Sequence, residues 1–172
     1  MAVSIYAEGI MIKPTVAIAA VAVLLGLVAL NGCRGWGTEG GLPAAQIGPL
    51  EREGTVVELS SFKGTPMLIE FWATWCGPCR EAMPEIQAIH DKFGPQGLKV
   101  AAISNETRFE VESFKKSSSY TFSVYLDIDD NANNAFGVRG FPTAFLVNRE
   151  GRIVWSGHPR DPKLRVAIKN VL

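Results

Sequence analysis

The chain has 172 residues, which is enough for one globular domain. Its 17 basic and 17 acidic side chains cancel to a net charge of zero, which argues against nucleic acid as the main partner. The composition is otherwise ordinary for a globular protein, apart from a strongly apolar N-terminus.

That N-terminus, residues 1–32, is predicted to be a signal peptide or a membrane anchor. Lys13 precedes the uncharged tract Pro14–Leu30, which is shorter than the roughly 20 residues of a typical transmembrane helix. Leu30-Asn31-Gly32-Cys33 resembles the signal of bacterial lipoproteins, in which the cysteine carries lipid. A lipidated Cys33, a plain signal peptide and an uncleaved anchor stay open as alternatives. Each of them places the rest of the chain outside the cytoplasm.

Residues 33–46 are rich in glycine and are predicted to be a flexible tether. The folded domain is predicted to occupy residues 47–172. It should begin with a hairpin that turns at Glu51–Gly54 and returns as the strand Thr55–Leu59. The nearly continuous apolar stretch Pro66–Trp72 follows, and we expect it to be a central strand that is buried on both faces.

The segment Gly77–Phe93 is predicted to be a helix, because its apolar residues recur every three or four positions and Gly94-Pro95 then ends it. The remaining predicted elements are, in chain order, the strand Leu98–Ile103, the helix Thr107–Ser118, the strand Phe122–Leu126, the helix Asn131–Phe136, the strands Thr143–Asn148 and Arg152–Ser156, and the helix Asp161–Leu172. This alternation implies an α/β sandwich around a mixed central sheet.

Cys76 and Cys79 stand at the predicted start of the first long helix. The first N–H groups of a helix lack partners and carry partial positive charge, so they stabilise a thiolate at Cys76. Cys79 lies on the same helix face and reaches the Cys76 sulfur. Cys76 is therefore predicted to be the exposed nucleophile, and Cys79 the buried thiol that closes the disulfide. The alternatives are a structural disulfide and a zinc site, which needs a second ligand pair.

The segment from Phe71 to Cys79, Phe-Trp-Ala-Thr-Trp-Cys-Gly-Pro-Cys, is similar to the active-site segment of thioredoxins. From about Ile47 to Leu172 the chain resembles the TlpA and ResA group of membrane-tethered thiol–disulfide oxidoreductases. The resemblance implies a thioredoxin fold, with a central mixed sheet flanked by helices, an N-terminal hairpin and a helix-strand insertion. If Cys33 carries lipid, the chain's three cysteines leave only the redox pair as thiols.

The resemblance also implies roles for residues around the dithiol. Pro142 matches in context the cis-proline that faces the dithiol in thioredoxin-like proteins. A proline offers no N–H to the sheet, so the neighbouring backbone of Phe141 is free to pair with an extended substrate. Trp75 is expected to shield Cys76 and, together with Gly77-Pro78, to contact partners.

Glu70 lies in the apolar strand where thioredoxins carry aspartate and many TlpA-like proteins carry asparagine. Burial should raise the pKa of this carboxyl by desolvation, and the group would then relay a proton to or from Cys79. Two alternatives stay open. The longer side chain either reaches water or pairs with Lys63 or Lys99.

The predicted function is that of an extracytoplasmic thiol–disulfide oxidoreductase, which needs no cofactor because the disulfide is itself the redox centre. The resemblance implies exported protein substrates, apocytochrome c among them, and rereduction by a membrane electron donor of the DsbD or CcdA kind. Gly77-Pro78 between the cysteines favours a reductase. The rival from another class is a Cu(I)-binding chaperone with a thioredoxin fold. A peroxidase is disfavoured because Cys79 stands beside the first cysteine.

Overall fold

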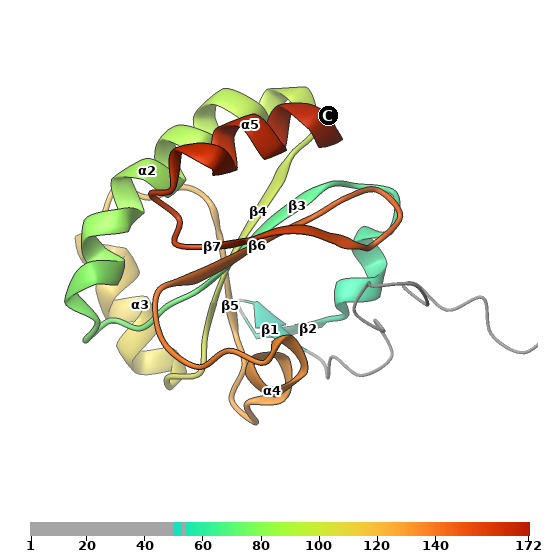
Figure 1. The fold of residues 1–172 in the computed structure, drawn as a ribbon. Helices are drawn as coiled ribbons and strands as arrows, with labels where there is room; N and C mark the ends of the chain where they lie inside the picture. Colours follow the sequence, from blue (N-terminus) through green and yellow to red (C-terminus); the bar gives the residue numbers. More distant parts are fainter. Residues whose placement is uncertain (1–49, 53) are drawn as a thin grey trace, which may run out of the picture. The chain divides into compact units, whose positions relative to one another are not determined.

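The computed structural model describes residues 50–52 and 54–172, so the predictions for segments 1–32 and 33–46 and for Cys33 lie outside the described residues (Figure 1). The described elements are, in chain order, β1 (Leu50–Arg52), β2 (Thr55–Val57), the 3₁₀ helix η2 (Leu59–Phe62), β3 (Met67–Phe71), α2 (Gly77–Phe93), the 3₁₀ helix η3 (Gly94–Gln96), β4 (Lys99–Ser104), α3 (Arg108–Ser117), β5 (Ser123–Leu126), α4 (Asn131–Phe136), β6 (Thr143–Val147), β7 (Ile153–Gly157) and α5 (Pro162–Val171).

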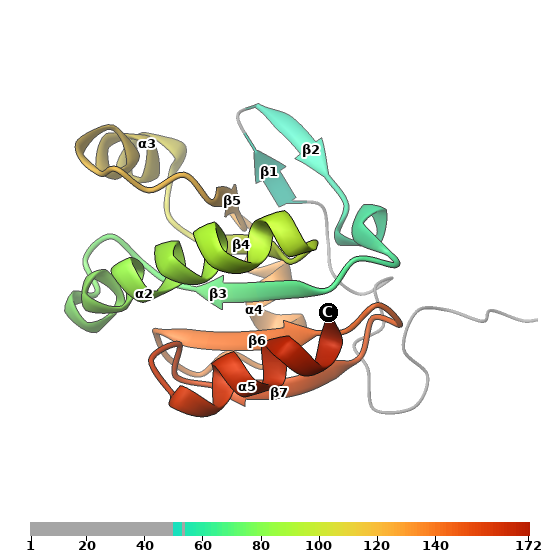
Figure 2. The same cartoon turned by 90° about the horizontal axis from the view of Figure 1, so that it is seen from above.

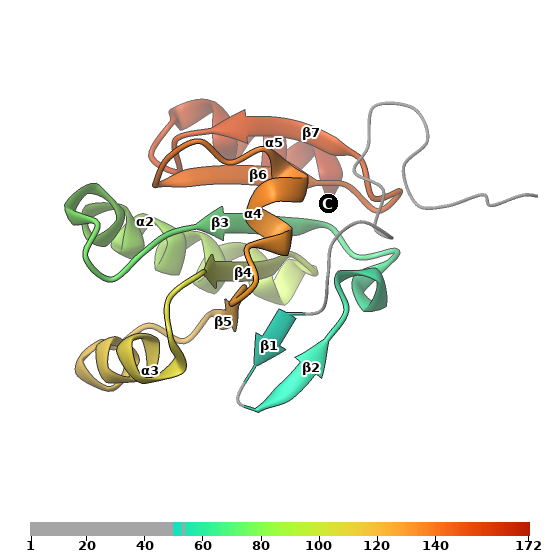
Figure 3. The same ribbon diagram turned by 90° about the horizontal axis from the view of Figure 1, so that it is seen from below.

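The described strands form one mixed sheet in the order β2-β1-β5-β4-β3-β6-β7. Strands β3, β4 and β5 are parallel, whereas β6 and β7 run antiparallel on one side and the β1–β2 hairpin joins the edge of β5 on the other. Helices α2 and α5 lie in front of the sheet in Figure 2, and α4 lies in front of the opposite face in Figure 3. The predicted α/β thioredoxin-like fold with an N-terminal hairpin is confirmed.

Strand β3 is buried along its whole length, as its apolar sequence predicts. Successive side chains of a strand point to opposite faces, so the strand supplies two separate apolar clusters. Leu68 and Trp72 join the cluster beneath α2 and α5, while Ile69 and Phe71 join the cluster beneath α4. Burial of each such side chain contributes about 1.5–3 kcal/mol to folding. The even-numbered face of β3 is thus the one that meets the cysteine-bearing helix.

The predicted position of the first hairpin turn is wrong. Glu51 lies inside β1, where it pairs with Val56 of β2 and with Leu126 of β5, and the pairing of β1 with β2 continues to Arg52, so the turn does not begin at Glu51. A long-range contact explains the difference, because the Glu51 carboxylate forms an ion pair with Arg108 at the start of α3. The predicted return strand also ends early, at Val57, because η2 follows it.

The chain order of the strands brings the functional region to one edge of the sheet. The carboxyl ends of the parallel strands β3, β4 and β5 meet at this edge, and the antiparallel β6 begins there. Helix α2 starts from the loop that follows β3, with the bounds Gly77–Phe93 that the sequence predicts. Among the described residues, no helix has the length and apolar character needed to cross a membrane.

Candidate active site

The two cysteines of the motif form a disulfide at the N-terminus of α2, with 5.2 Å between their Cα atoms. Cys76 is the N-cap residue, and its sulfur accepts a hydrogen bond from the backbone N–H of Cys79 at 3.2 Å. Gly77 and Pro78 occupy the first turn, where the missing N–H of proline costs little. The helix therefore directs at the Cys76 sulfur both the positive end of its dipole and a backbone N–H that has no partner within the helix. Both favour the thiolate once the disulfide opens.

The two sulfurs differ less in exposure than the sequence predicts. Cys79 is fully buried, as expected, but Cys76 is only 5% exposed, so the prediction of an exposed nucleophile is wrong for this disulfide form. The disulfide holds the Cys76 sulfur against Cys79, and both residues belong to the apolar cluster beneath α2. The preceding Trp75 is 71% exposed instead and forms the accessible surface of the loop.

A cis peptide bond joins Phe141 to Pro142, which confirms the predicted conformation of this loop. Both residues are half-buried and lie immediately before β6. The rings of Trp75 and Phe141 are neighbours, with centroids 6.1 Å apart. The structure therefore brings together the cysteine loop and the cis-proline loop, as the resemblance implies. The roles predicted for Trp75, Gly77, Pro78, Phe141 and Pro142 in substrate binding stay predictions.

Glu70 is fully buried in β3, and neither oxygen of its carboxyl group has a hydrogen-bond partner among the described residues. In register it lies between Ala102 of β4 and Ala144 of β6, and both alanines belong to the cluster that contains Cys79. These small neighbours leave space for the longer glutamate side chain. Burial raises the pKa of Glu70 from 4.5 to about 8, because the apolar surroundings penalise the charged form.

The two alternative explanations for Glu70 are wrong. The side chain does not reach water, because the residue is completely buried. It also has no ion pair with Lys63 or Lys99, which are both exposed, and burial alone accounts for its raised pKa. What remains is a neutral, buried carboxyl group on the same side of the sheet as the dithiol, which is the placement that the proton-relay prediction requires.

Sequence reasoning missed Glu106, which follows β4 and contacts the cysteine loop. Its carboxylate accepts hydrogen bonds from the backbone N–H and the hydroxyl of Thr74, both at 2.6 Å. Thr74 precedes Trp75 in the loop between β3 and α2. The sequence signal for this contact is weak, because the two residues are 32 positions apart and their proximity depends on the parallel pairing of β3 with β4.

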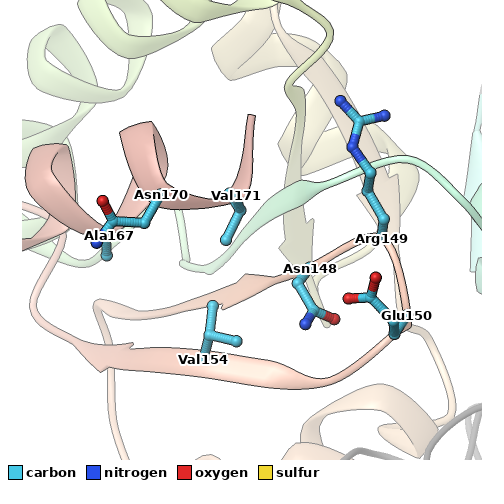
Figure 4. A pocket seen from close by; sticks show the side chains of 7 residues that line it. All are labelled: Asn148, Arg149, Glu150, Val154, Ala167, Asn170 and Val171. Carbon is cyan, nitrogen blue, oxygen red and sulfur yellow. The ribbon is translucent and has the colours of Figure 1, made fainter.

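A pocket of about 330 Å³ lies outside this region, between the β6–β7 turn and the end of α5 (Figure 4), at the end of β6 opposite to the cis-proline. Arg149, Glu150 and Asn170 on its rim are exposed surface side chains. Within the described part of the chain, no three His, Cys, Asp or Glu side chains are grouped so that they could hold a metal ion.

A Cys-x-x-Cys disulfide at a helix start, beside a cis-proline loop on a mixed sheet with helices on both faces, defines the class of thioredoxin-like dithiol proteins. Residues 41–156 match the AhpC/TSA family, and the chain belongs to this family. Within it, the predicted resemblance to the TlpA and ResA group is confirmed by the relatives that the chain matches.

One such relative is the thiol-disulfide oxidoreductase ResA of Bacillus subtilis, which is 36% identical over 105 residues, covering 60% of this chain and 59% of that protein. The chain thus spans about three fifths of the length of the curated relatives it matches. A crystal structure assigned to the thiol:disulfide interchange protein DsbE of Chlorobium tepidum is 26% identical and has a TM-score of 0.65, covering 78% of this chain and 95% of that chain. A solution structure assigned to a thioredoxin of Neisseria meningitidis is also 26% identical, with a TM-score of 0.65 and coverage of 72% and 86%.

Proposed function

We propose that this protein is an extracytoplasmic, membrane-tethered thiol–disulfide oxidoreductase that reduces the disulfides of exported proteins. The observation that carries the proposal is the Cys76–Cys79 disulfide at the start of α2, beside the cis Phe141–Pro142 bond. The names of its relatives, ResA and DsbE, support the same reaction. Because the disulfide is itself the redox centre, the reaction needs no further cofactor.

The reaction begins when the thiolate of reduced Cys76 attacks one sulfur of a substrate disulfide. The substrate S–S bond breaks, a mixed disulfide with Cys76 forms, and the first substrate thiolate leaves and takes up a proton. Cys79 then loses its proton and attacks the Cys76 sulfur. The Cys76–Cys79 bond re-forms, and the second substrate sulfur leaves as a thiolate that takes up a proton from solvent. Two electrons pass from the protein's dithiol to the substrate in the whole sequence.

Glu70 supplies and receives the proton of Cys79 in this scheme. With its pKa raised to about 8, the carboxyl group is mostly protonated in the disulfide form at neutral pH. When an electron donor opens the disulfide, Cys79 leaves as a thiolate in an apolar cluster, and the Glu70 proton neutralises it. The carboxylate that remains takes the proton back when Cys79 attacks the mixed disulfide. The proton thus moves between two buried groups without a route to water.

The proposed location rests on the N-terminal sequence, and the proposed partners rest on the resemblance to the TlpA and ResA group. Lys13 and the apolar tract Pro14–Leu30 support export, and Cys33 is the proposed site of a lipid anchor. A tethered reductase outside the cytoplasm needs a membrane electron donor, which we assign to the DsbD or CcdA kind. The disulfides of apocytochrome c and of other exported proteins are the proposed substrates. Mass spectrometry of the purified N-terminus tests the anchor, because an unmodified Cys33 would reject it.

The reduction potential of the full chain tests the reaction and its direction. The protein is equilibrated in glutathione or dithiothreitol buffers, and the two thiols of the motif are counted by alkylation and mass spectrometry. We expect a two-electron transition below about −230 mV, on the thioredoxin side of the scale, and Cys76→Ser should abolish it. A potential near that of DsbA, about −120 mV, would make the protein an oxidant that installs disulfides. The absence of any transition, together with dithiol-dependent binding of Cu(I), would replace the proposal by the chaperone alternative.

A further inference from the structure

The loop from Ala73 to Trp75 connects the central strand to the cysteine-bearing helix, and one side chain from the loop after β4 holds it in place. The Thr74 backbone N–H donates to Oε2 of Glu106 at 2.6 Å, and the Thr74 hydroxyl donates to Oε1 at 2.6 Å. Both oxygens of one carboxylate are thus directed at a single loop residue. Side-chain hydrogen bonds of this length to a charged acceptor are among the stronger ones in proteins.

Glu106 is itself held in place by Ser104. The hydroxyl of Ser104, a fully buried residue at the end of β4, donates to Glu106 Oε2 at 3.0 Å and accepts from the Glu106 backbone N–H at 3.2 Å. Three side-chain and backbone donors therefore converge on a carboxylate that is only half-buried. The two oxygens of a carboxylate can accept several hydrogen bonds, so this one side chain holds all three donors. The arrangement of Glu106, Thr74 and Ser104 is called the loop clamp below.

The loop clamp acts on the residues that a protein substrate would meet. Trp75 follows Thr74 directly, is 71% exposed, and places its ring 6.1 Å from that of Phe141 in the cis-proline loop. Cys76 comes next and is tied to the same loop, because its backbone N–H donates to the Ala73 carbonyl at 3.1 Å. Releasing Thr74 would therefore move the Trp75 ring relative to Phe141, while the Cys76 sulfur keeps its hydrogen bond from α2.

We propose that Glu106 is a positioning residue for protein substrates, and that the loop clamp sets the Trp75–Phe141 surface on which a polypeptide docks before exchange. The inference rests on the proposed function and deepens it. A small disulfide needs only an accessible sulfur, whereas a polypeptide must also lie along the exposed Trp75 ring and the Phe141 backbone. Loss of the loop clamp should therefore slow exchange with protein disulfides selectively.

The test compares two disulfides of different size in a single turnover, so that no electron donor is needed. The prereduced full chain is mixed with insulin or with hydroxyethyl disulfide, and its oxidation is followed by acid quenching and alkylation. Glu106→Gln keeps the size of the side chain but offers one acceptor oxygen instead of two. We expect the second-order rate constant with insulin to fall about tenfold, and that with hydroxyethyl disulfide to stay within about twofold.

Glu110→Gln is the matched control. Glu110 is an exposed carboxylate near Glu106 in sequence, and it accepts from the backbone N–H and hydroxyl of Thr107 in the capping box of α3. This variant loosens the start of α3 without touching Thr74, so both rate constants should stay within about twofold of those of the unmodified protein. A selective loss with insulin in this control would assign the effect to α3 and overturn the proposal.

A second pair of variants tests the other side of the loop clamp and does not depend on the folding of Glu106→Gln. Thr74→Ser keeps the hydroxyl donor and should react with insulin at nearly the original rate. Thr74→Val removes it and should lower that rate several-fold. In the Glu106→Gln background, Thr74→Val should add little, because the bond is already lost. Full additivity of the two substitutions would contradict the loop clamp.

The outcomes separate this inference from the proposed function. If the reduced, unmodified protein is oxidised by neither insulin nor hydroxyethyl disulfide, the proposed oxidoreductase activity is rejected, and the positioning role is rejected with it. If it reacts with both, and Glu106→Gln leaves the ratio of the two rate constants unchanged, only the positioning role fails. Equal losses with both disulfides would likewise reject it, because they would show a general structural effect rather than a selective one.

Discussion

Two glutamates, Glu70 inside β3 and Glu106 just after the end of the neighbouring β4, have opposite surroundings near the same dithiol. Glu70 is fully buried, has no hydrogen-bond partner among the described residues, and has a pKa raised to about 8. Glu106 is half-buried and accepts hydrogen bonds from Thr74 and Ser104. A buried carboxyl group without donors favours its neutral form, and the carboxylate of Glu106 instead serves as the acceptor of three hydrogen bonds. The same residue type is thus suited to holding a proton at one position and to anchoring a loop at the other.

The strand register explains why the two glutamates differ. Glu70 lies in the middle of β3 with a buried alanine on each neighbouring strand. These alanine side chains offer no hydrogen-bond donor to its carboxyl oxygens. Glu106 lies beyond the end of β4, where backbone N–H groups of the next loop are not used by the sheet. Position along a strand therefore decides whether a glutamate is buried without a partner or accepts hydrogen bonds from a loop.

The largest effect is expected for Cys79→Ser. This variant also tests whether Glu70 acts in the second step of the reaction, the attack of Cys79 on the mixed disulfide. This variant should lose turnover of a protein disulfide by about a thousandfold or more, because the mixed disulfide on Cys76 lacks its resolving thiol. The adduct should accumulate on a nonreducing gel. Adding Glu70→Gln to this variant should leave the rate of adduct formation within about twofold. Slower adduct formation would show that Glu70 acts at the Cys76 step.

The next largest effect is expected for Glu70→Gln in the otherwise unmodified protein. The amide keeps the shape of the side chain but cannot exchange a proton with Cys79, so turnover should fall about a hundredfold. Alkylation of Cys76 by iodoacetamide should stay within about twofold, because that sulfur is governed by the start of α2. Turnover equal to that of the unmodified protein would reject the proposal that Glu70 exchanges a proton with Cys79.

Much of the region around the dithiol could be predicted from the sequence, because its signals are local. The N-cap cysteine, the proline in the first turn and Gly94-Pro95 at the end define α2 within the helix's own sequence. The full burial of Glu70 follows from the apolar residues on both sides of it in β3. The cis bond before Pro142 has no such local signal; it was predicted from the resemblance to thioredoxin-like proteins, and the structure confirms it.

The parts that could not be predicted depend on contacts between distant segments. The first hairpin turn is displaced because Glu51 pairs with β5 and forms an ion pair with Arg108, and neither contact has a local signal. The hydrogen bonds of Glu106 join residues 32 positions apart through the pairing of two strands. The low exposure of Cys76 reflects a sulfur that the disulfide holds inside an apolar cluster, which the motif alone does not specify.

The pH dependence of stability provides a third way to test the surroundings of Glu70. Its pKa is about 8 in the folded protein and near 4.5 when unfolded, so the folded state binds the proton more tightly. The stabilisation is therefore complete below about pH 4.5 and is lost progressively as the pH rises through about 8. Glu70→Gln should lack this loss.

Urea unfolding of the disulfide form measures this difference at about pH 5, 6, 7 and 8. In that form Cys76 and Cys79 do not titrate, so the difference between the two proteins isolates Glu70. We expect the free energy of unfolding of the unmodified protein to fall relative to that of Glu70→Gln as the pH rises. Parallel curves would show that Glu70 has the same pKa in the folded and unfolded states, and its contrast with Glu106 would disappear.

The smallest effect is expected for a third carboxylate, that of Glu85, which is neither buried nor clamped. It accepts from Arg165 Nε at 2.7 Å and joins α2 to α5, with about a third of each side chain exposed to solvent. Water screens such a pair, so Glu85→Gln should lower the free energy of unfolding by only about 0.2–1 kcal/mol. The loss should shrink further in about 1 M salt, where the Debye length is about 3 Å. A larger, salt-independent loss would mean that an ion pair at a half-exposed glutamate can contribute as much stability as burial does. Burial would then no longer be enough to rank the glutamates of this fold by the effect of their substitution.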